Sequence, residues 1–243
     1  MRNNFMKNIA LLFAIALLFG ASGFGAPAEN PYAGKLFASG DVKKAEFALT
    51  FDDGPGYITE DLLKLLEKRG VKVAFFLLGS NVRAYPSRAA KVAAAGHLVC
   101  SHTDSHLFWP KVGKAPDREA VLRRELEESG ATIEKATGVR PTVLRMPNGY
   151  DKPWVRQAAA KLGYTLVNWT YGSDWTKISE EKMLGEYLKA LRPGAILLLH
   201  DGGGKAKEKN LRLVEAILAE AAKKNLKPVR LDDLLGLSAP AVR

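Results

Sequence analysis

The stretch AEFALTFDDGPGYITEDLLKLLEKR, residues 45–69, contains a complete passage from a strand to a helix. Residues 45–51 are an apolar run typical of a buried strand. Residues 59–69 carry leucines at helical spacing, and Thr59 is the expected N-cap of this helix. Between them stand two adjacent aspartates, Asp52 and Asp53, followed by the turn-forming sequence Gly-Pro-Gly. Neighbouring carboxylates repel, so burying both is costly unless a cation or a proton intervenes. The stretch therefore predicts either a polar turn at a strand end or half of an active site.

The same alternation continues through the rest of the chain. Further apolar runs predict strands at residues 71–78, 97–101, 142–146, 164–169, 195–200 and about 228–231. Helical patterns lie between them at residues 86–96, 117–136, 153–163, 179–191 and 206–224. Such alternation predicts an α/β fold with a parallel sheet and helices outside it. About seven strands without an intervening linker favour one barrel-like domain, whose active site forms at the carboxyl ends of the strands.

The amino terminus predicts a secretory signal peptide over residues 1–28. Two basic residues precede an apolar stretch at residues 9–19, and small residues follow it. These small residues allow cleavage after Gly23, Gly25 or Ala28. The apolar stretch is short for a membrane span of roughly 20 residues. We therefore expect a secreted, periplasmic or cell-envelope protein without a stable membrane span after cleavage.

Composition and charge indicate which kinds of molecule the protein is expected to bind. Of the 243 residues, 47% are apolar, which suffices for a sizeable core. The net charge is +10 and falls to +8 when the predicted signal peptide, with Arg2 and Lys7, is removed. Its basic residues are scattered along helices rather than clustered with aromatics, so we expect a solvated basic surface and no nucleic-acid partner. The single cysteine, Cys100, excludes an internal disulfide, and we expect a monomer.

Polar residues of types that can catalyse a reaction or bind a metal follow the predicted strands. They are Asp52 and Asp53, the segment SHTDSH at 101–106, Arg145, Asp174 with Trp175, and His200 with Asp201. All fall at the same end of the predicted barrel, where parallel strands place an active site.

The pair His102 and His106 has a spacing that brings two imidazoles to one metal from a helical turn. A carboxylate from a neighbouring strand end would complete a three-ligand site with room for water and substrate. Zn²⁺ is the natural occupant of an Asp/His₂ set, and other borderline divalent ions are alternatives. A bound cation would also relieve the repulsion between the paired aspartates.

Two further polar residues each allow two interpretations. His200 is either a core histidine bonded to a carbonyl or a general acid that Asp174 orients and keeps charged. Arg145 forms either a surface ion pair or, at the end of a buried strand, a clamp that fixes one carboxylate.

Five segments together resemble the polysaccharide deacetylase (NodB-homology) family of carbohydrate esterases. They are TFDDGPG, HTDSH, RMPNG, SDW and ILLLH, in the family's order and relative spacing. The resemblance covers residues 43–235, which we interpret as the catalytic domain, between an N-terminal extension at 29–42 and a C-terminal tail at 236–243. It implies a distorted, incomplete (β/α) barrel of about seven parallel strands.

The resemblance also implies a role for each matching residue. Asp52 is expected to be the catalytic base, positioned by Arg145, and His200 the general acid, tuned by Asp174. The expected metal ligands are Asp53, His102 and His106, with Zn²⁺ or another divalent transition metal such as Co²⁺ as the cofactor. The expected substrate-binding residues are Asn148, whose backbone N–H would hold the oxyanion, and Trp175 and Leu198, which would line the acetyl pocket. Apart from the resemblance, Tyr150 near a predicted loop is expected either to bind substrate in a sugar groove or to belong to the core.

Two positions depart from the family pattern. Asn148 stands where an aromatic residue is common, which changes the groove wall. Tyr171 stands where members often carry a further aspartate. The resemblance therefore does not say which residue supports Asp174 in this chain.

The implied activity is metal-dependent hydrolysis of N-acetyl groups from an N-acetylglucosamine polysaccharide, with peptidoglycan or chitin-like oligomers as the expected substrate. One alternative is an O-acetyl esterase acting on a glycan such as acetylated xylan, and another is a related amidohydrolase acting on a small amide. A third is a metal-bearing glycan-binding protein without turnover.

Overall fold

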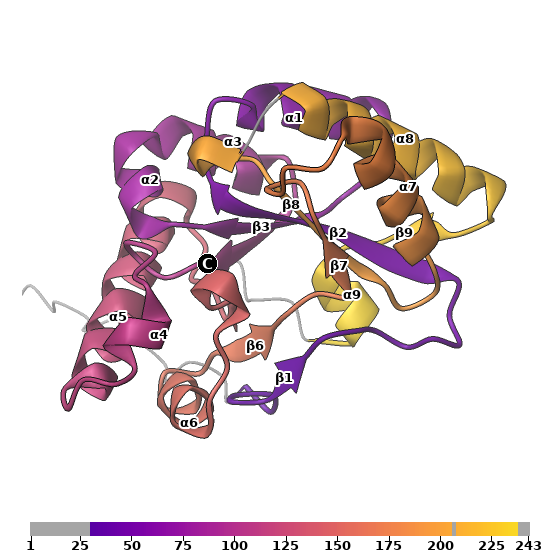
Figure 1. Cartoon of the computed structure of the whole chain (residues 1–243). Coiled ribbons are helices and arrows are strands. Elements are labelled where there is room, and N and C mark those ends of the chain that lie inside the picture. Colours follow the sequence, from indigo (N-terminus) through magenta and orange to yellow (C-terminus); the bar gives the residue numbers. More distant parts are fainter. Residues whose placement is uncertain (1–29, 206–207, 238–243) are drawn as a thin grey trace, which may run out of the picture.

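The computed structural model describes residues 30–205 and 208–237, which form one curled parallel sheet with helices around it (Figure 1). The predicted signal peptide with its cleavage sites, and residues 238–243 of the predicted C-terminal tail, lie outside the described residues.

The sheet has nine strands, and every strand pair in it is parallel. The strands are β1 (Leu36–Phe37), β2 (Glu46–Gly54), β3 (Ala74–Leu77), β4 (Leu98–Ser101), β5 (Val143–Leu144), β6 (Thr165–Val167), β7 (Tyr171–Gly172), β8 (Ile196–His200) and β9 (Lys227–Pro228). Their order is β1-β6-β5-β4-β3-β2-β8-β7, and β9 pairs with β2 beside this path. Because β1 and β7 end the order on opposite edges, the barrel is incomplete, which confirms the predicted fold class.

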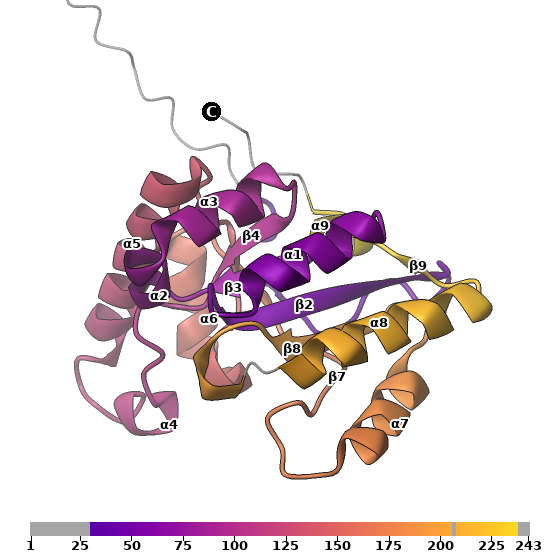
Figure 2. The ribbon, with the colours of Figure 1, turned by 90° about the horizontal axis from the view of Figure 1, so that it is seen from above.

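Nine α-helices lie in the described parts of the chain, around the outside of the sheet and at its open side (Figures 1 and 2). They are α1 (Thr59–Lys68), α2 (Gly79–Ala84), α3 (Pro86–Ala94), α4 (Trp109–Val112), α5 (Arg118–Thr137), α6 (Pro153–Lys161), α7 (Glu180–Ala190), α8 (Glu208–Lys223) and α9 (Leu231–Leu235). Two short 3-10 turns, η1 (Pro147–Gly149) and η2 (Gly203–Lys205), follow strands β5 and β8.

The central strand β2 shows why the sheet has two different faces. Successive side chains of a strand point to opposite faces, and Phe47, Leu49 and Phe51 pack in the large cluster beneath α1, α3, α7 and α8. The intervening Ala48 belongs to the inner cluster. The same alternation puts Thr50 and Asp52 on the inner face, so the strand delivers a carboxylate into the curl of the sheet.

The inner cluster is small, and α9 closes it from one end. Leu231 and Leu234 of α9 pack there with Phe76 of β3 and Ile196 of β8. The opposite end of the curl, at the carboxyl ends of the strands, holds polar residues instead. A third cluster joins α4, α5 and α6 to β5 and β6.

Several local expectations differ from the structure. Helices α2 and α4 are additional to the predicted ones, and β3, β5 and β6 are shorter than the strands predicted at residues 71–78, 142–146 and 164–169. The strands β1 and β7 are additional to the seven predicted ones, and the last predicted strand is shorter, since Leu231 already begins α9. Thr59, the expected N-cap of the first helix, lies inside α1, which Ile58 caps instead. The Thr59 hydroxyl turns back to the strand end, where it accepts a hydrogen bond from the Gly56 N–H (2.7 Å) and donates one to Asp201 (2.5 Å).

The segment before β2, expected to be an N-terminal extension, packs on the sheet. The Asn30 amide donates to the Gly163 carbonyl (2.8 Å), and β1 pairs with β6. The described residues of this segment therefore belong to the same folded unit. Within residues 30–205 and 208–237, no helix combines the length and apolar character that crossing a bilayer requires.

His97, at the start of β4 and away from the polar end of the curl, makes the fold sensitive to acid. Its Nδ1 accepts a hydrogen bond from the Val73 N–H (3.2 Å), and burial, with the charges of Lys72 and Arg230, lowers its pKa to about 4. Between pH 6.5 and about 4, this histidine is protonated in the unfolded chain but neutral in the folded protein. The unfolded chain therefore binds one proton more in this range. Stability is therefore lost as the pH falls from about 6.5 to about 4, by about 3 kcal/mol in all.

We expect His97→Gln to flatten this pH dependence. Urea unfolding of wild type and variant at several values between pH 7 and pH 4.5 measures it, because the difference in unfolding free energy between the two proteins should shrink as the pH falls. Parallel pH profiles for the two proteins would contradict the assignment.

Candidate active site

Strands β2 and β8 place two polar side chains opposite each other at the end of the curl. Their register pairs Asp52 with His200, and the Asp201 N–H donates to the Asp52 carbonyl (3.2 Å). Both side chains are buried, at 3% and 4% exposure. Backbone pairing alone therefore brings the predicted base and the predicted acid to the same place.

Arg145 fixes the orientation of Asp52. The guanidinium is fully buried, and its Nη1 donates to Asp52 Oδ1 (2.7 Å) and to the Thr50 hydroxyl (2.9 Å). The remaining donors bond the carbonyls of Val167 (3.2 Å) and Asn168 (3.1 Å). A planar group held by four acceptors cannot rotate, so Asp52 Oδ1 is committed to Arg145 and Oδ2 faces the cavity side. The surface ion pair considered for Arg145 is wrong.

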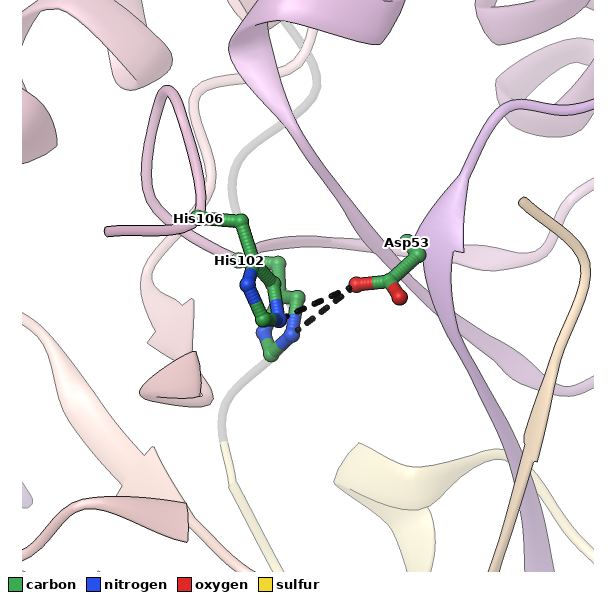
Figure 3. A group of neighbouring side chains, drawn as sticks. All are labelled: Asp53, His102 and His106. Carbon is green, nitrogen blue, oxygen red and sulfur yellow. Dashed lines mark ion pairs between the residues drawn. The ribbon is translucent and has the colours of Figure 1, made fainter. Parts of the chain in front are cut away.

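Asp53, His102 and His106 form a cluster suited to one metal ion (Figure 3). Asp53 Oδ1 lies 3.4 Å from the Nε2 atom of each histidine. One ligand atom from each residue lies within 4.8 Å of the other two. Figure 3 shows both imidazoles directing a nitrogen toward the same carboxylate oxygen. The structure thus brings the three predicted ligands together.

The hydrogen bonding of His102 fits the role of a metal ligand. Its Nδ1 lies 2.7 Å from the Arg145 carbonyl, which only accepts, so Nδ1 carries the proton and Nε2 keeps its lone pair toward the cluster. Burial holds the pKa of His102 below its ordinary value, which favours the neutral form that binds metals. The Arg145 carbonyl therefore selects the His102 tautomer that a divalent metal needs.

The backbone between the two histidines is not the helical turn that their spacing predicts. The segment has no helical assignment, and Thr103 (φ 69°) and His106 (φ 55°) adopt left-handed conformations. The i, i+4 spacing therefore works through a tight loop. The loop brings the two imidazoles to 5.2 Å between ring centroids.

His200 and Asp174 form a second polar pair on the other side of the cluster. Asp174 Oδ1 lies 2.9 Å from His200 Nδ1, and Asp174 Oδ2 accepts from the His200 N–H (2.8 Å). Burial lowers the pKa of His200, but the hydrogen bond and charge of Asp174, with the charges of Asp52 and Asp53, outweigh it. The pKa of His200 therefore lies above its ordinary value. This arrangement favours the protonated form of the imidazole.

A cavity of about 260 Å³ opens over these groups. It is lined by Asp52, His102, His106, Asn148, Trp169, Trp175, Leu198 and His200. The Trp175 ring stands edge-on to His200, with 5.3 Å between ring centroids. Asn148 adopts a left-handed conformation (φ 57°), which asparagine tolerates better than most residues.

Tyr150 is the one predicted substrate-binding residue that is not among the residues lining this cavity. It packs against the third cluster, with its ring 6.2 Å from that of Trp154. The remaining predicted site residues either line the cavity or bond directly to residues that do.

Comparisons with known proteins agree with this geometry. A family model described as polysaccharide deacetylase matches residues 39–167, more than half of the chain. The chain belongs to the polysaccharide deacetylase family. The family match confirms the prediction, made from the sequence motifs, that the protein is a deacetylase.

Relatives of this deacetylase are named as deacetylases of peptidoglycan N-acetylglucosamine and of chitooligosaccharide. A peptidoglycan-N-acetylglucosamine deacetylase of Bacillus cereus is 29% identical over 82% of this chain and 72% of its own length. A chitooligosaccharide deacetylase of Bradyrhizobium sp. is 34% identical over 67% of this chain and 73% of its own length. The solved structure of the Bc1960 peptidoglycan N-acetylglucosamine deacetylase, bound to a hydroxamate-type benzamide, superposes with a TM-score of 0.76. It is 27% identical and covers 86% of this chain and 96% of its own.

The deacetylase site contains supporting residues that the sequence did not reveal. Asn210 of α8 donates to Asp174 Oδ2 (2.7 Å) and to the His200 carbonyl (2.7 Å), so it supports Asp174 from a remote helix. No sequence pattern marks Asn210, because it stands in an amphipathic helix. Trp169 lines the cavity, and its place at the end of a predicted strand was the available signal.

Asp201 braces the turn that follows the paired aspartates. It is fully buried, accepts from Thr59, and lies so close to Gly54 and Gly56 that a side chain at either glycine would collide with it. Burial raises the pKa of Asp201 to about 7. The two glycines of the deacetylase turn are therefore required by close approach of the β8 end.

Proposed function

We propose that this deacetylase removes N-acetyl groups from an N-acetylglucosamine-containing polysaccharide and releases acetate. One observation carries the proposal: a carboxylate fixed on one oxygen, a three-ligand cluster and an imidazole paired with Asp174 converge on a single cavity. The substrates named for the relatives support N-acetylglucosamine polymers. The predicted export and the positive net charge support peptidoglycan, an envelope polymer, as the first candidate.

Asp53, His102 and His106 would hold a divalent metal, with zinc as the first candidate and cobalt as the second. When bound, such an ion supplies Lewis acidity, which polarises an acyl carbonyl and makes water a better nucleophile.

Two residues beside the cluster carry out the proton transfers: Asp52 accepts a proton and His200 donates one. Asp52 accepts a proton from the attacking water at Oδ2, since Arg145 holds Oδ1. The backbone N–H of Asn148, at the cavity wall, would donate to the oxyanion that forms on the acetyl carbonyl. His200 then gives its proton to the departing amine, which leaves glucosamine in the polymer and acetate in solution. Trp175 and Leu198 would line the space for the acetyl methyl group.

Acetate release from three matched substrates tests the proposal. We expect metal-loaded protein to release acetate from peptidoglycan or N-acetylglucosamine oligomers faster than from O-acetylated xylan. Stripping the metal with a chelator should abolish release, and zinc or cobalt should restore it. Faster release from xylan would establish the ester alternative, and binding of glycan without any release would establish a non-catalytic binding protein. Activity that survives complete metal removal would contradict the metal dependence.

A further inference from the structure

The loop that joins the two histidine ligands is held from outside the site by helices α2 and α5. We propose that Glu125 of α5, together with the Arg83–Asp104 ion pair, is a positioning device that sets the two imidazoles for metal binding. The proposal rests on the proposed metal role of His102 and His106.

Glu125 accepts hydrogen bonds from backbone N–H groups of the loop, which belongs to no helix or strand. It is buried at 6% exposure. Its Oε2 accepts from the N–H groups of Asp104 (3.0 Å) and Ser105 (2.9 Å), and its Oε1 accepts from the Ser105 hydroxyl (2.6 Å). Three bonds from one carboxylate thus fix the segment midway between the two ligands. Charge-assisted bonds of this kind are stronger than neutral ones.

The opposite edge of the loop is bound by α2. The carbonyls of Thr103 and Asp104 accept from the N–H groups of Gly79 (3.1 Å) and Ser80 (2.9 Å). Arg83, one turn later, donates both Nη1 and Nη2 to the Asp104 carboxylate, each at 2.7 Å. The loop is therefore held through its amides by α5 and through its carbonyls and one side chain by α2.

The conformation of the loop explains why such a clamp is needed. Thr103 and His106 both have positive φ, at 69° and 55°, which non-glycine residues adopt only where the surroundings impose it. A loop released from Glu125 would relax toward ordinary backbone angles. The Nε2 atoms of His102 and His106, each now 3.4 Å from Asp53 Oδ1, would then move apart. Loss of the clamp should therefore appear as weaker metal binding before it appears as unfolding.

Glu125→Gln tests the device, with Glu127→Gln as the matched control. Gln keeps the size of the side chain but not its charge. Its single oxygen can make only neutral hydrogen bonds to the two backbone N–H groups, and its NH₂ group cannot accept from the Ser105 hydroxyl. Glu127 is exposed on the same helix, so its variant makes the same charge change away from the loop. We expect zinc affinity, measured by competition with a chromophoric chelator, to fall about 10–100-fold in Glu125→Gln and to stay at the wild-type value in Glu127→Gln.

The visible spectrum of cobalt-loaded protein gives a second readout, because it reports the geometry of the ligands rather than stability. We expect an altered spectrum for Glu125→Gln and an unaltered one for the control. If Glu125→Gln fails to fold, Arg83→Leu decides, since the Arg83 side chain is half exposed and its loss releases Asp104 without opening the core. We expect this variant to shift affinity and spectrum in the same direction.

Wild-type affinity and spectrum in the folded variants would overturn the proposal. So would a wild-type protein that binds neither zinc nor cobalt. A wild type that binds metal but releases no acetate would instead defeat the proposed function and leave the positioning role of Glu125 standing.

Discussion

Replacing Asp52 by asparagine lowers kcat on acetylated glycan by on the order of 10²–10⁴-fold and leaves metal binding near the wild-type value. The amide is the same size as the carboxylate, and its oxygen can still accept from Arg145 Nη1, so the geometry of the site persists. What disappears is the capacity to take a proton from water at Oδ2. Because Asp53, and not Asp52, belongs to the three-ligand cluster, zinc affinity should not follow the loss of turnover.

Three measurements on one preparation make this expectation decisive. They are acetate release, zinc affinity and thermal stability, the last because removing one charge beside buried Arg145 carries a cost. Asp61→Asn is the matched control, since Asp61 lies on the surface of α1 and pairs only with exposed Lys64 in the interactions described there. A kcat within a few-fold of wild type in Asp52→Asn would assign the base to another group.

Loss of the His200 imidazole should cost on the order of 10²–10⁴-fold on an N-acetyl substrate and much less on an activated aryl acetate. An amine must be protonated before it can leave, whereas a phenolate with a low pKa leaves without help. Asp174 holds His200 through two hydrogen bonds and favours its charged form, which suits it to this donation.

His200→Ala measured on both substrates separates this role from simple damage to the site. A general collapse would lower both rates by similar factors, and an unchanged rate on the N-acetyl substrate would reject the role of His200 as the acid. His97→Gln supplies a control in which a buried histidine outside the cavity is replaced.

The sequence was sufficient for the long elements and insufficient for the short ones. Strands such as β2 and β8 carry several consecutive apolar residues, and their two-sided burial is visible in the pattern. The two-residue strands β1 and β7 contain too few residues to show a period, and they exist because neighbouring strands offer free edges. Helix α2 follows β3 after a single intervening residue, so no turn signal separates them.

At the site, residue identity was predictable and geometry was not. The spacing of His102 and His106 pointed to a shared ligand, but it suggested a helical turn where the chain forms a left-handed loop. Thr59 looked like a helix cap because the sequence does not show that Asp201, from the far end of the chain, comes within reach.

Supporting residues were the hardest to foresee. Glu125 and Asn210 sit in amphipathic helices, where a polar residue ordinarily faces water. Their partners are distant in sequence, and only the packing of the helices on the sheet brings them together. Tertiary contacts thus decide which polar residues of a helix serve the site.

The parallel register of β2 and β8 holds the groups proposed for proton transfer independently of the connections that surround the cavity. The spacing between proton acceptor and proton donor is fixed by main-chain bonds inside the sheet. Exposed aromatic residues such as Tyr57 and Phe108 stand instead on the connections after the strands. Insertions or exchanges in those connections can reshape the groove without disturbing proton transfer. The same reaction centre on this sheet is therefore compatible with differently shaped substrate grooves.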